Sequence, residues 1–115
     1  MGGALVISAI ANASDEFSSA APFYGVPDLT KISLANIKIP VVGHFGEHDE
    51  VPNFSDKATA LKLEAAAKEA GVDFTLRMWD AGHGFMNASN PAHYNEAAAK
   101  GGLAEAIAFF KRTLA

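Results

Sequence analysis

The stretch IPVVGHFGEHD, residues 39–49, decides the fold. Residues 39–45 form an apolar run of strand length with little polar alternation, which is typical of a strand buried on both faces. Such strands belong to parallel sheets that helices cover on both sides. The glycine and polar residues at 46–49 predict a loop at the carboxyl end of this strand. Functional groups of open parallel sheets gather in loops of this kind.

Helix and strand patterns alternate on either side of this stretch. We predict helices over 4–11, 55–70 and 95–114, strands over 18–24 and 72–78, and a short helical turn over 29–37. The order indicates the α/β class, with about three parallel strands flanked by helices in a single domain, residues 1–115.

The helix predicted over 55–70 carries the clearest local signals. Ser55 is placed to cap its start, Glu64 and Lys68 are spaced for an i,i+4 ion pair, and Gly71 ends it. The apolar stripes that we expect to be buried are Ala58, Leu61 and Ala65 in this helix, and Leu103, Ile107, Phe110 and Leu114 in the last one. The first helix is apolar on nearly all sides, so we expect most of its surface to be buried.

Composition excludes several classes of function. The chain has 9 basic and 13 acidic side chains, a formal net charge of −4, and its basic residues are scattered, which argues against nucleic acid and anionic membranes as partners. It has no cysteine, so it contains no disulfide, zinc-thiolate site or cysteine nucleophile. No apolar run approaches the ~20 residues of a membrane helix, and no signal peptide is evident. We expect a cytoplasmic protein without a cofactor.

Two loops have the content of a catalytic site. One follows the strand at 39–45 and contains Asp49, and the other follows the strand at 72–78 and contains His83. Neighbouring parallel strands would bring these loops together. A carboxylate there can fix the tautomer of the imidazole, which can then act as a general base near neutral pH. For Asp49 the alternative is an Asx-type turn, and for His83 a loop histidine bonded to the backbone.

The chain resembles the C-terminal half of the dienelactone hydrolase family of α/β-hydrolases. The resemblance rests on PFYG at 22–25, PVVGHFGEHD at 40–49, AGHGF at 81–85 and AIAFFKRTL at the end, and it covers essentially the whole chain. It implies that Asp49 is the acid and His83 the base of a catalytic triad, with Tyr24 and Phe85 as substrate-binding residues. An arginine that some members carry after the triad histidine is absent, so a dienelactone substrate is not implied.

The start of the chain matches the residues that follow the nucleophile in this family. Met1, Gly2 and Gly3 take the place of the end of the G-x-C/S-x-G-G elbow, in which helix-end backbone N–H groups stabilise the oxyanion. The chain begins in a helix without a cap and lacks the cysteine or serine nucleophile, so we expect the isolated chain to be inactive. Ser8 and Ser89 lie outside any elbow, so we do not expect either to replace the nucleophile.

Two alternatives stay open at this point. The first is a hydrolase of carboxylic esters or lactones whose nucleophile comes from an upstream segment. The second is a non-catalytic half-domain that associates with itself, or binds a partner or a small ligand. In both, the edge of the strand at 18–24 is exposed and is covered by a second copy or by a missing N-terminal half. His44, Glu47 and His48 have no spacing typical of metal ligands, so no metal is predicted.

Overall fold

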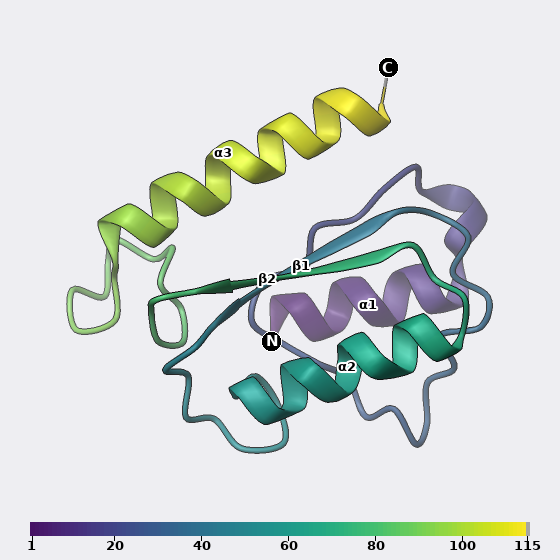
Figure 1. The fold of residues 1–115 in the computed structure, drawn as a ribbon, viewed down its shortest axis with the longest axis horizontal. Coiled ribbons are helices and arrows are strands. Elements are labelled where there is room, and N and C mark those ends of the chain that lie inside the picture. Colours follow the sequence, from purple (N-terminus) through teal and green to yellow (C-terminus); the bar gives the residue numbers. More distant parts are fainter. Residues whose placement is uncertain (115) are drawn as a thin grey trace.

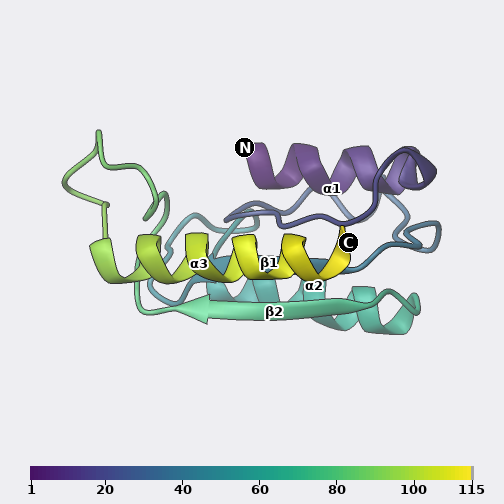
Figure 2. The ribbon, with the colours of Figure 1, turned by 90° about the horizontal axis from the view of Figure 1, so that it is seen from above.

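The computed structural model describes residues 1–114 and has an α/β architecture. The elements in chain order are α1 (Gly2–Asn12), the 3₁₀ turn η1 (Ser14–Glu16), β1 (Val41–Gly46), α2 (Lys57–Glu69), β2 (Phe74–Trp79) and α3 (Glu96–Thr113). Figures 1 and 2 show three layers, with α3 on one face of the sheet and α1 and α2 on the other. The predicted α/β class is therefore confirmed. Within residues 1–114, no helix combines the length and apolar character needed to cross a bilayer.

β1 and β2 pair in parallel, with Val41 opposite Phe74 and Gly46 opposite Trp79. Alternate residues of each strand face opposite layers. Phe45 points into the main core, which α1 and α2 close with Ile7, Ile10 and Leu63. Phe45 has no exposed surface, and Ile7 and Leu63 have 1–2% exposed. This layer is the main source of hydrophobic stabilisation, at roughly 25 cal/mol per Å² of buried apolar surface.

The predicted strand over 18–24 runs beside β1 but is not continuous. Only the bridges Ala20 to Val41 and Phe23 to His44 form, both parallel. The N–H groups of Ala20 and Tyr24 donate to carbonyls on the β1 side, at 3.1 and 2.8 Å. Pro22 stands between them and has no N–H, so one rung of the ladder cannot form. The segment keeps the position and direction expected of a third strand but not its regular pairing.

The helix ends agree better with the sequence than the helix faces do. The pair Glu64–Lys68 forms at 3.7 Å, and Gly71 ends α2 with φ of +78°. Ser55, however, is not the cap of α2, because the helix begins after Asp56. Over 29–37 there are isolated hydrogen-bonded turns in place of a helical turn.

Both predicted stripes are wrong. The buried residues of α2 are Ala60, Leu63 and Ala67, and those of α3 are Ala98, Ala99, Gly102, Ala106 and Phe109. Leu61, Leu103, Ile107 and Leu114 are instead among the exposed large apolar side chains. In α1 the burial is also one-sided, since Leu5 is 60% exposed.

Small residues face inward in α3 because aromatic rings occupy the space below it. A Cβ atom at Gly101 would lie 2.6 Å from the ring of Trp79, and one at Gly102 would lie 3.2 Å from the ring of Phe23. Arg77 of β2 also reaches up to α3, where its Nε donates to Glu105 at 2.7 Å. The glycines therefore let the helix approach the sheet closely.

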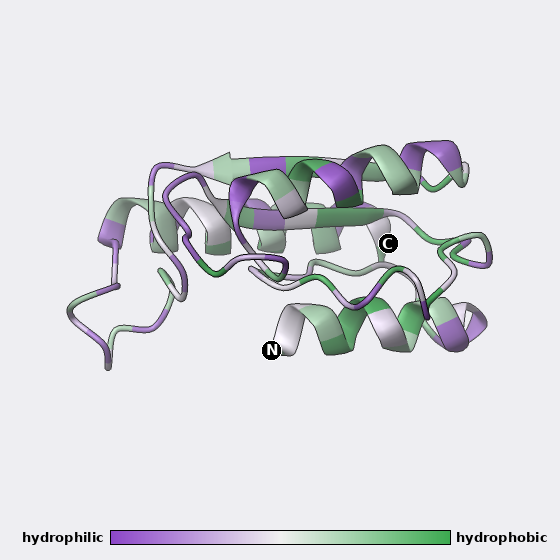
Figure 3. Ribbon diagram, turned by 90° about the horizontal axis from the view of Figure 1, so that it is seen from below, coloured by the Kyte–Doolittle hydropathy of each residue, from purple (hydrophilic) through white to green (hydrophobic). Residues whose placement is uncertain are grey.

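An apolar groove follows the free edge of residues 18–24. It has a volume of about 280 Å³ and is lined by Val6, Ala9, Ile10, Phe17, Ser19, Ala20, Ala21 and Phe110. Figure 3 shows hydrophobic residues along most of α1, which borders this edge. The groove thus joins apolar groups from both helix layers at the side of the sheet that carries no further strand within residues 1–114.

Candidate active site

The loops that follow β1 and β2 are held together at the carboxyl end of the sheet. The N–H groups of Glu47 and His48 donate to the carbonyls of Trp79 and Ala81, at 2.8 and 3.0 Å. A Cβ atom at Gly46 would lie 2.3 Å from the Ala81 carbonyl oxygen, so only glycine permits this approach. The glycine in the GEHD motif therefore sets how near the two loops lie.

Asp49 and His83 meet between these loops. The Oδ2 atom of Asp49 lies 2.8 Å from Nδ1 of His83, and the Asp49 side chain has no exposed surface. Its other oxygen, Oδ1, accepts the N–H of Val51 at 2.9 Å. Asp49 therefore makes an Asx-type turn and also holds the imidazole, so its two interpretations are compatible. The acid and base predicted from the sequence lie together as a bonded pair.

The opposite nitrogen of His83 is unengaged. Its Nε2 has no hydrogen-bond partner within residues 1–114, and the side chain is 34% exposed. The ring lies edge-on to Tyr24, with centroids 5.1 Å apart, and near Phe54. A carboxylate on Nδ1 favours the tautomer with its hydrogen on that atom, which leaves the Nε2 lone pair available to accept a proton.

Ser55 is a member of this site that sequence reasoning missed. Its Oγ lies 2.9 Å from Nδ1 of His83, and the residue has no exposed surface. The serine just before a helix was interpreted as a cap, but its side chain turns toward the histidine. A possible signal was Asp56, which is also a good cap residue and leaves Ser55 without that role.

Tyr24 and Phe85 lie next to the histidine at different depths. Phe85 has no exposed surface, and its ring packs edge-on against Tyr24 with centroids 5.3 Å apart. Tyr24 itself has a positive φ of 34°, a conformation that costs a non-glycine residue roughly 1 kcal/mol or more. Burial raises the pKa of the Tyr24 hydroxyl, and a hydrogen bond from the Met86 backbone opposes this. In this arrangement Tyr24 faces His83 and Phe85 supports it from behind.

The start of α1 lies beside Tyr24. A Cβ atom at Gly3 would lie 2.2 Å from the carbonyl oxygen of Phe23, and one at Gly25 would lie 2.8 Å from the nitrogen of Ala4. Both glycines are therefore needed for this close backbone contact. The free N–H groups and positive end of the helix dipole at Met1, Gly2 and Gly3 thus lie near the aromatic residue that contacts His83.

His44 is a different kind of histidine. It is fully buried on the sheet face under α3, stacked on Phe23 with centroids 4.5 Å apart, and its Nδ1 accepts the indole N–H of Trp79 at 3.1 Å. Its Nε2 is buried and has no hydrogen-bond partner among residues 1–114. Burial lowers the pKa of His44 to about 4, a shift that the nearby Glu105 opposes and Arg77 reinforces.

One group within residues 1–114 has donor atoms close enough to share a metal ion, namely Glu47, His48 and Asp80. All of them are exposed, and His48 Nε2 already contacts Asp80 Oδ1 at 2.6 Å. An exposed ion pair accounts for this arrangement, and we assign no metal to it.

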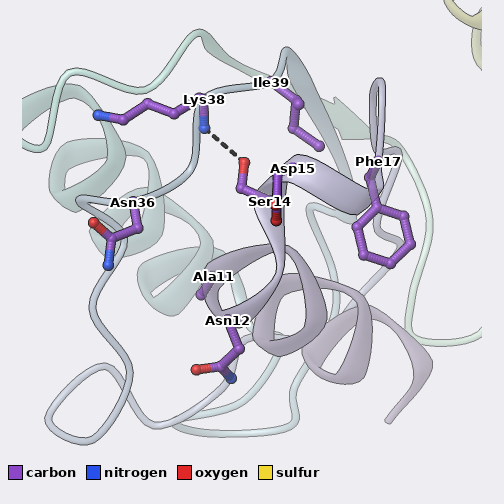
Figure 4. A pocket seen from close by; sticks show the side chains of 8 residues that line it. All are labelled: Ala11, Asn12, Ser14, Asp15, Phe17, Asn36, Lys38 and Ile39. Carbon is purple, nitrogen blue, oxygen red and sulfur yellow. Dashed lines mark hydrogen bonds between the residues drawn. The ribbon is translucent and has the colours of Figure 1, made fainter.

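A cavity of about 440 Å³ lies at the other end of the sheet, where the chain enters β1 (Figure 4). Ser14 is buried there, and its Oγ accepts the backbone N–H of Lys38 at 2.9 Å. Because Lys38 precedes β1 and Asp49 follows it, this cavity is separate from the histidine site.

Comparisons with known proteins show which family the chain belongs to. The model of the dienelactone hydrolase family matches residues 1–114. The chain is 29% identical over 114 residues to the protein usf of Aquifex pyrophilus. It has the same identity over the same length to a candidate carboxymethylenebutenolidase of Aquifex aeolicus strain VF5. Each match covers 98% of this chain and 48% of the relative, so the chain spans about half the length of these curated relatives.

Solved structures share the fold. A candidate dienelactone hydrolase from Klebsiella pneumoniae superposes with a TM-score of 0.80 at 22% identity, over 95% of this chain and 48% of that one. A thermostable esterase superposes with a TM-score of 0.57 at 22% identity, over 89% of this chain and 28% of that one. The fold of residues 1–114 thus corresponds to about half of the Klebsiella pneumoniae chain and to about a quarter of the esterase chain.

Proposed function

The chain belongs to the dienelactone hydrolase family, and from that premise we propose that it carries the acid and base of a carboxylic-ester or lactone hydrolase. The observation that supports this most directly is the pair of Asp49 and His83, joined at 2.8 Å through Nδ1 while Nε2 is unengaged. That is the arrangement a general base needs to accept a proton from a nucleophile.

The proposed reaction is acyl transfer. A serine or cysteine nucleophile attacks the carbonyl carbon and gives its proton to Nε2 of His83, while Asp49 stabilises the imidazolium. The imidazolium then protonates the leaving alcohol, and water releases the acid by the same steps. Backbone N–H groups at Met1 to Gly3 would stabilise the oxyanion, since they form the start of a helix beside Tyr24.

The nucleophile is proposed to come from a segment other than residues 1–114. Ser55 is unsuitable because it contacts Nδ1 rather than Nε2 and has no exposed surface. We propose that this segment binds in the apolar groove at the edge of residues 18–24. It would add a strand there and pair with the backbone groups of that edge. Support comes from the relatives, which share this half of the fold and are about twice as long.

Complementation tests this proposal. The chain is co-expressed with the half of the Aquifex pyrophilus relative that it does not match, and hydrolysis of p-nitrophenyl acetate is measured. We expect no rate above background for the chain alone, and a rate in the complex that His83→Ala lowers by about 10²-fold or more. His93→Ala, which removes an exposed loop histidine, is the matched control. A hydrolysis rate that is equal in wild type and His83→Ala would contradict the proposed role.

A second candidate function is self-association without catalysis, which the same groove favours. Exposed Leu5, Phe17 and Ile107 border the groove or project from the adjoining helices. Multi-angle light scattering of the chain alone distinguishes the two. A dimer that Ala21→Lys dissociates would favour a second copy in the groove, whereas a monomer that forms a complex only with the complementary half would favour the hydrolase.

A further inference from the structure

The Nδ1 atom of His83 has two oxygen neighbours. Asp49 Oδ2 lies 2.8 Å from it and Ser55 Oγ lies 2.9 Å from it. Both oxygens are buried, and Ser55 has no exposed surface. The acid–base pair of a catalytic triad accounts for the contact with Asp49 only. The contact with Ser55 requires its own explanation.

The chemistry of the ring limits what Ser55 can do. A ring nitrogen carries either one hydrogen or one lone pair. A carboxylate at 2.8 Å requires the hydrogen, because two acceptors facing each other at that distance would repel. Ser55 Oγ then accepts the same Nδ1–H in a three-centre bond, using the acceptor capacity of its hydroxyl.

We propose that Ser55 is a positioning residue for His83, which fixes the plane of the ring and stabilises the Nδ1–H tautomer together with Asp49. Its role in turnover rests on the proposed function, but its effect on the ring does not. Because two oxygens hold the hydrogen on Nδ1, the lone pair stays on Nε2. This lone pair points away from Asp49 and toward the place where the nucleophile would lie.

The local backbone explains how one segment delivers both oxygens. The N–H groups of Ser55 and Asp56 both donate to the carbonyl of Val51, at 3.2 and 3.1 Å. Asn53, which lies between Val51 and Ser55, has φ of +59°, a left-handed conformation that asparagine tolerates better than most residues. The chain therefore turns sharply after Asp49 and returns Ser55 to the same nitrogen.

Nuclear magnetic resonance of the ¹⁵N-labelled chain tests this inference without any need for activity. The ring ¹⁵N shifts report the tautomer of His83, and the exchange rate of its Nδ1 proton reports how firmly that proton is held. We expect the Nδ1–H tautomer in the wild type, and exchange about fivefold faster in Ser55→Ala, the factor that corresponds to one neutral hydrogen bond. Asp49→Asn serves as a positive control and should change the tautomer itself.

Two further variants separate positioning from packing. Ser55→Cys keeps nearly the same volume with a much weaker acceptor, so it should also accelerate exchange if Ser55→Ala does not fold. Ser14→Ala removes another buried serine hydroxyl that accepts a hydrogen bond, at the opposite end of the sheet, and should leave the His83 signals unchanged.

The outcomes distinguish this inference from the proposed function. Unchanged exchange in folded Ser55→Ala and Ser55→Cys would overturn the positioning role, as would a wild-type ring with its hydrogen on Nε2. Accelerated exchange would support the role even if the complemented enzyme proves inactive, a result that would contradict the proposed function alone.

Discussion

The surroundings of His44 and His83 differ in a way that separates a structural histidine from a candidate catalytic one. In both rings Nδ1 is engaged, and Nε2 has no partner within residues 1–114. At His44, Nδ1 accepts a hydrogen bond from Trp79, so the neutral ring carries its hydrogen on Nε2. At His83, Nδ1 donates to Asp49, so the free nitrogen has a lone pair.

Exposure adds to this difference. His44 is completely buried, so its unpartnered Nε2–H faces no reactant, whereas His83 is 34% exposed at the end of the sheet. A donor enclosed by aromatic rings contributes a desolvation cost, while an acceptor open to solvent can take a proton. The partner on Nδ1 and the exposure of Nε2 therefore decide the role, and residue type alone does not.

The largest expected effect concerns the stability that depends on His44. Its pKa is lowered from 6.5 to about 4 by burial, so the unfolded chain binds a proton first as the pH falls. The part of the unfolding free energy that depends on neutral His44 is fully present above about pH 6.5. It is lost as the pH falls toward 4, and the loss is about 3 kcal/mol at 1.36 kcal/mol per pKa unit. We expect His44→Gln to remove this loss from denaturant unfolding measured between pH 7 and 4.

His93→Gln is the matched control for that measurement, because His93 is an exposed loop histidine. Its unfolding free energy should follow the wild-type pH profile. Parallel profiles for the wild type and His44→Gln would show that His44 is not held neutral by burial, and the contrast with His83 would disappear.

A smaller effect is expected at the helix that closes the His44 region. In Gly101→Ala the added Cβ would lie 2.6 Å from the ring of Trp79. The gain in helix propensity is about 1 kcal/mol, and overpacking costs about 1–3 kcal/mol, so a net loss of roughly 1 kcal/mol is expected. Trp79 is the single tryptophan of the chain, so its fluorescence would report the displacement directly.

Gly2→Ala provides the comparison for Gly101→Ala, since a Cβ atom at Gly2 meets nothing within 4 Å. That substitution should leave stability unchanged or slightly raised. The His83 ¹⁵N signals should be the same in both variants. A shift of those signals in Gly101→Ala alone would mean that the two histidine regions are coupled.

The sequence predicted that Asp49 and His83 lie together because each follows a strand within a short motif. Asp49 and His83 are 34 positions apart, but the parallel pairing of β1 and β2 brings the ends of both strands together. Ser55 was missed because its local pattern is that of a helix cap, whereas its hydrogen bond reaches a residue 28 positions away. The local pattern does not predict the turn at Val51 that returns Ser55 to His83.

The helix faces were predicted wrongly for a related reason. Large apolar residues such as Leu103 and Ile107 were expected to face inward, but the rings of Trp79 and Phe23 already fill the space above the sheet. Small residues must then face the sheet. The break in the strand over 18–24 follows from Pro22, whose effect depends on which side of the strand pairs.

The smallest expected effect is that of the charged residues Glu105 and Arg77 on the pKa of His44. Glu105 raises the pKa of His44 against the dominant effect of burial, and it also accepts two hydrogen bonds from Arg77. Glu105→Gln removes the negative charge and leaves Arg77 unpaired, so the pKa of His44 should fall further. The loss of stability should be about 0.5 kcal/mol, because both partners of the ion pair are 40–43% exposed.

Glu96→Gln, which breaks the exposed pair with Lys100 in the same helix, should leave the His44 titration unchanged. A rise in the pKa of His44 in Glu105→Gln, read from its ring proton resonances, would show that the burial of this ring and not its charged neighbours had been altered.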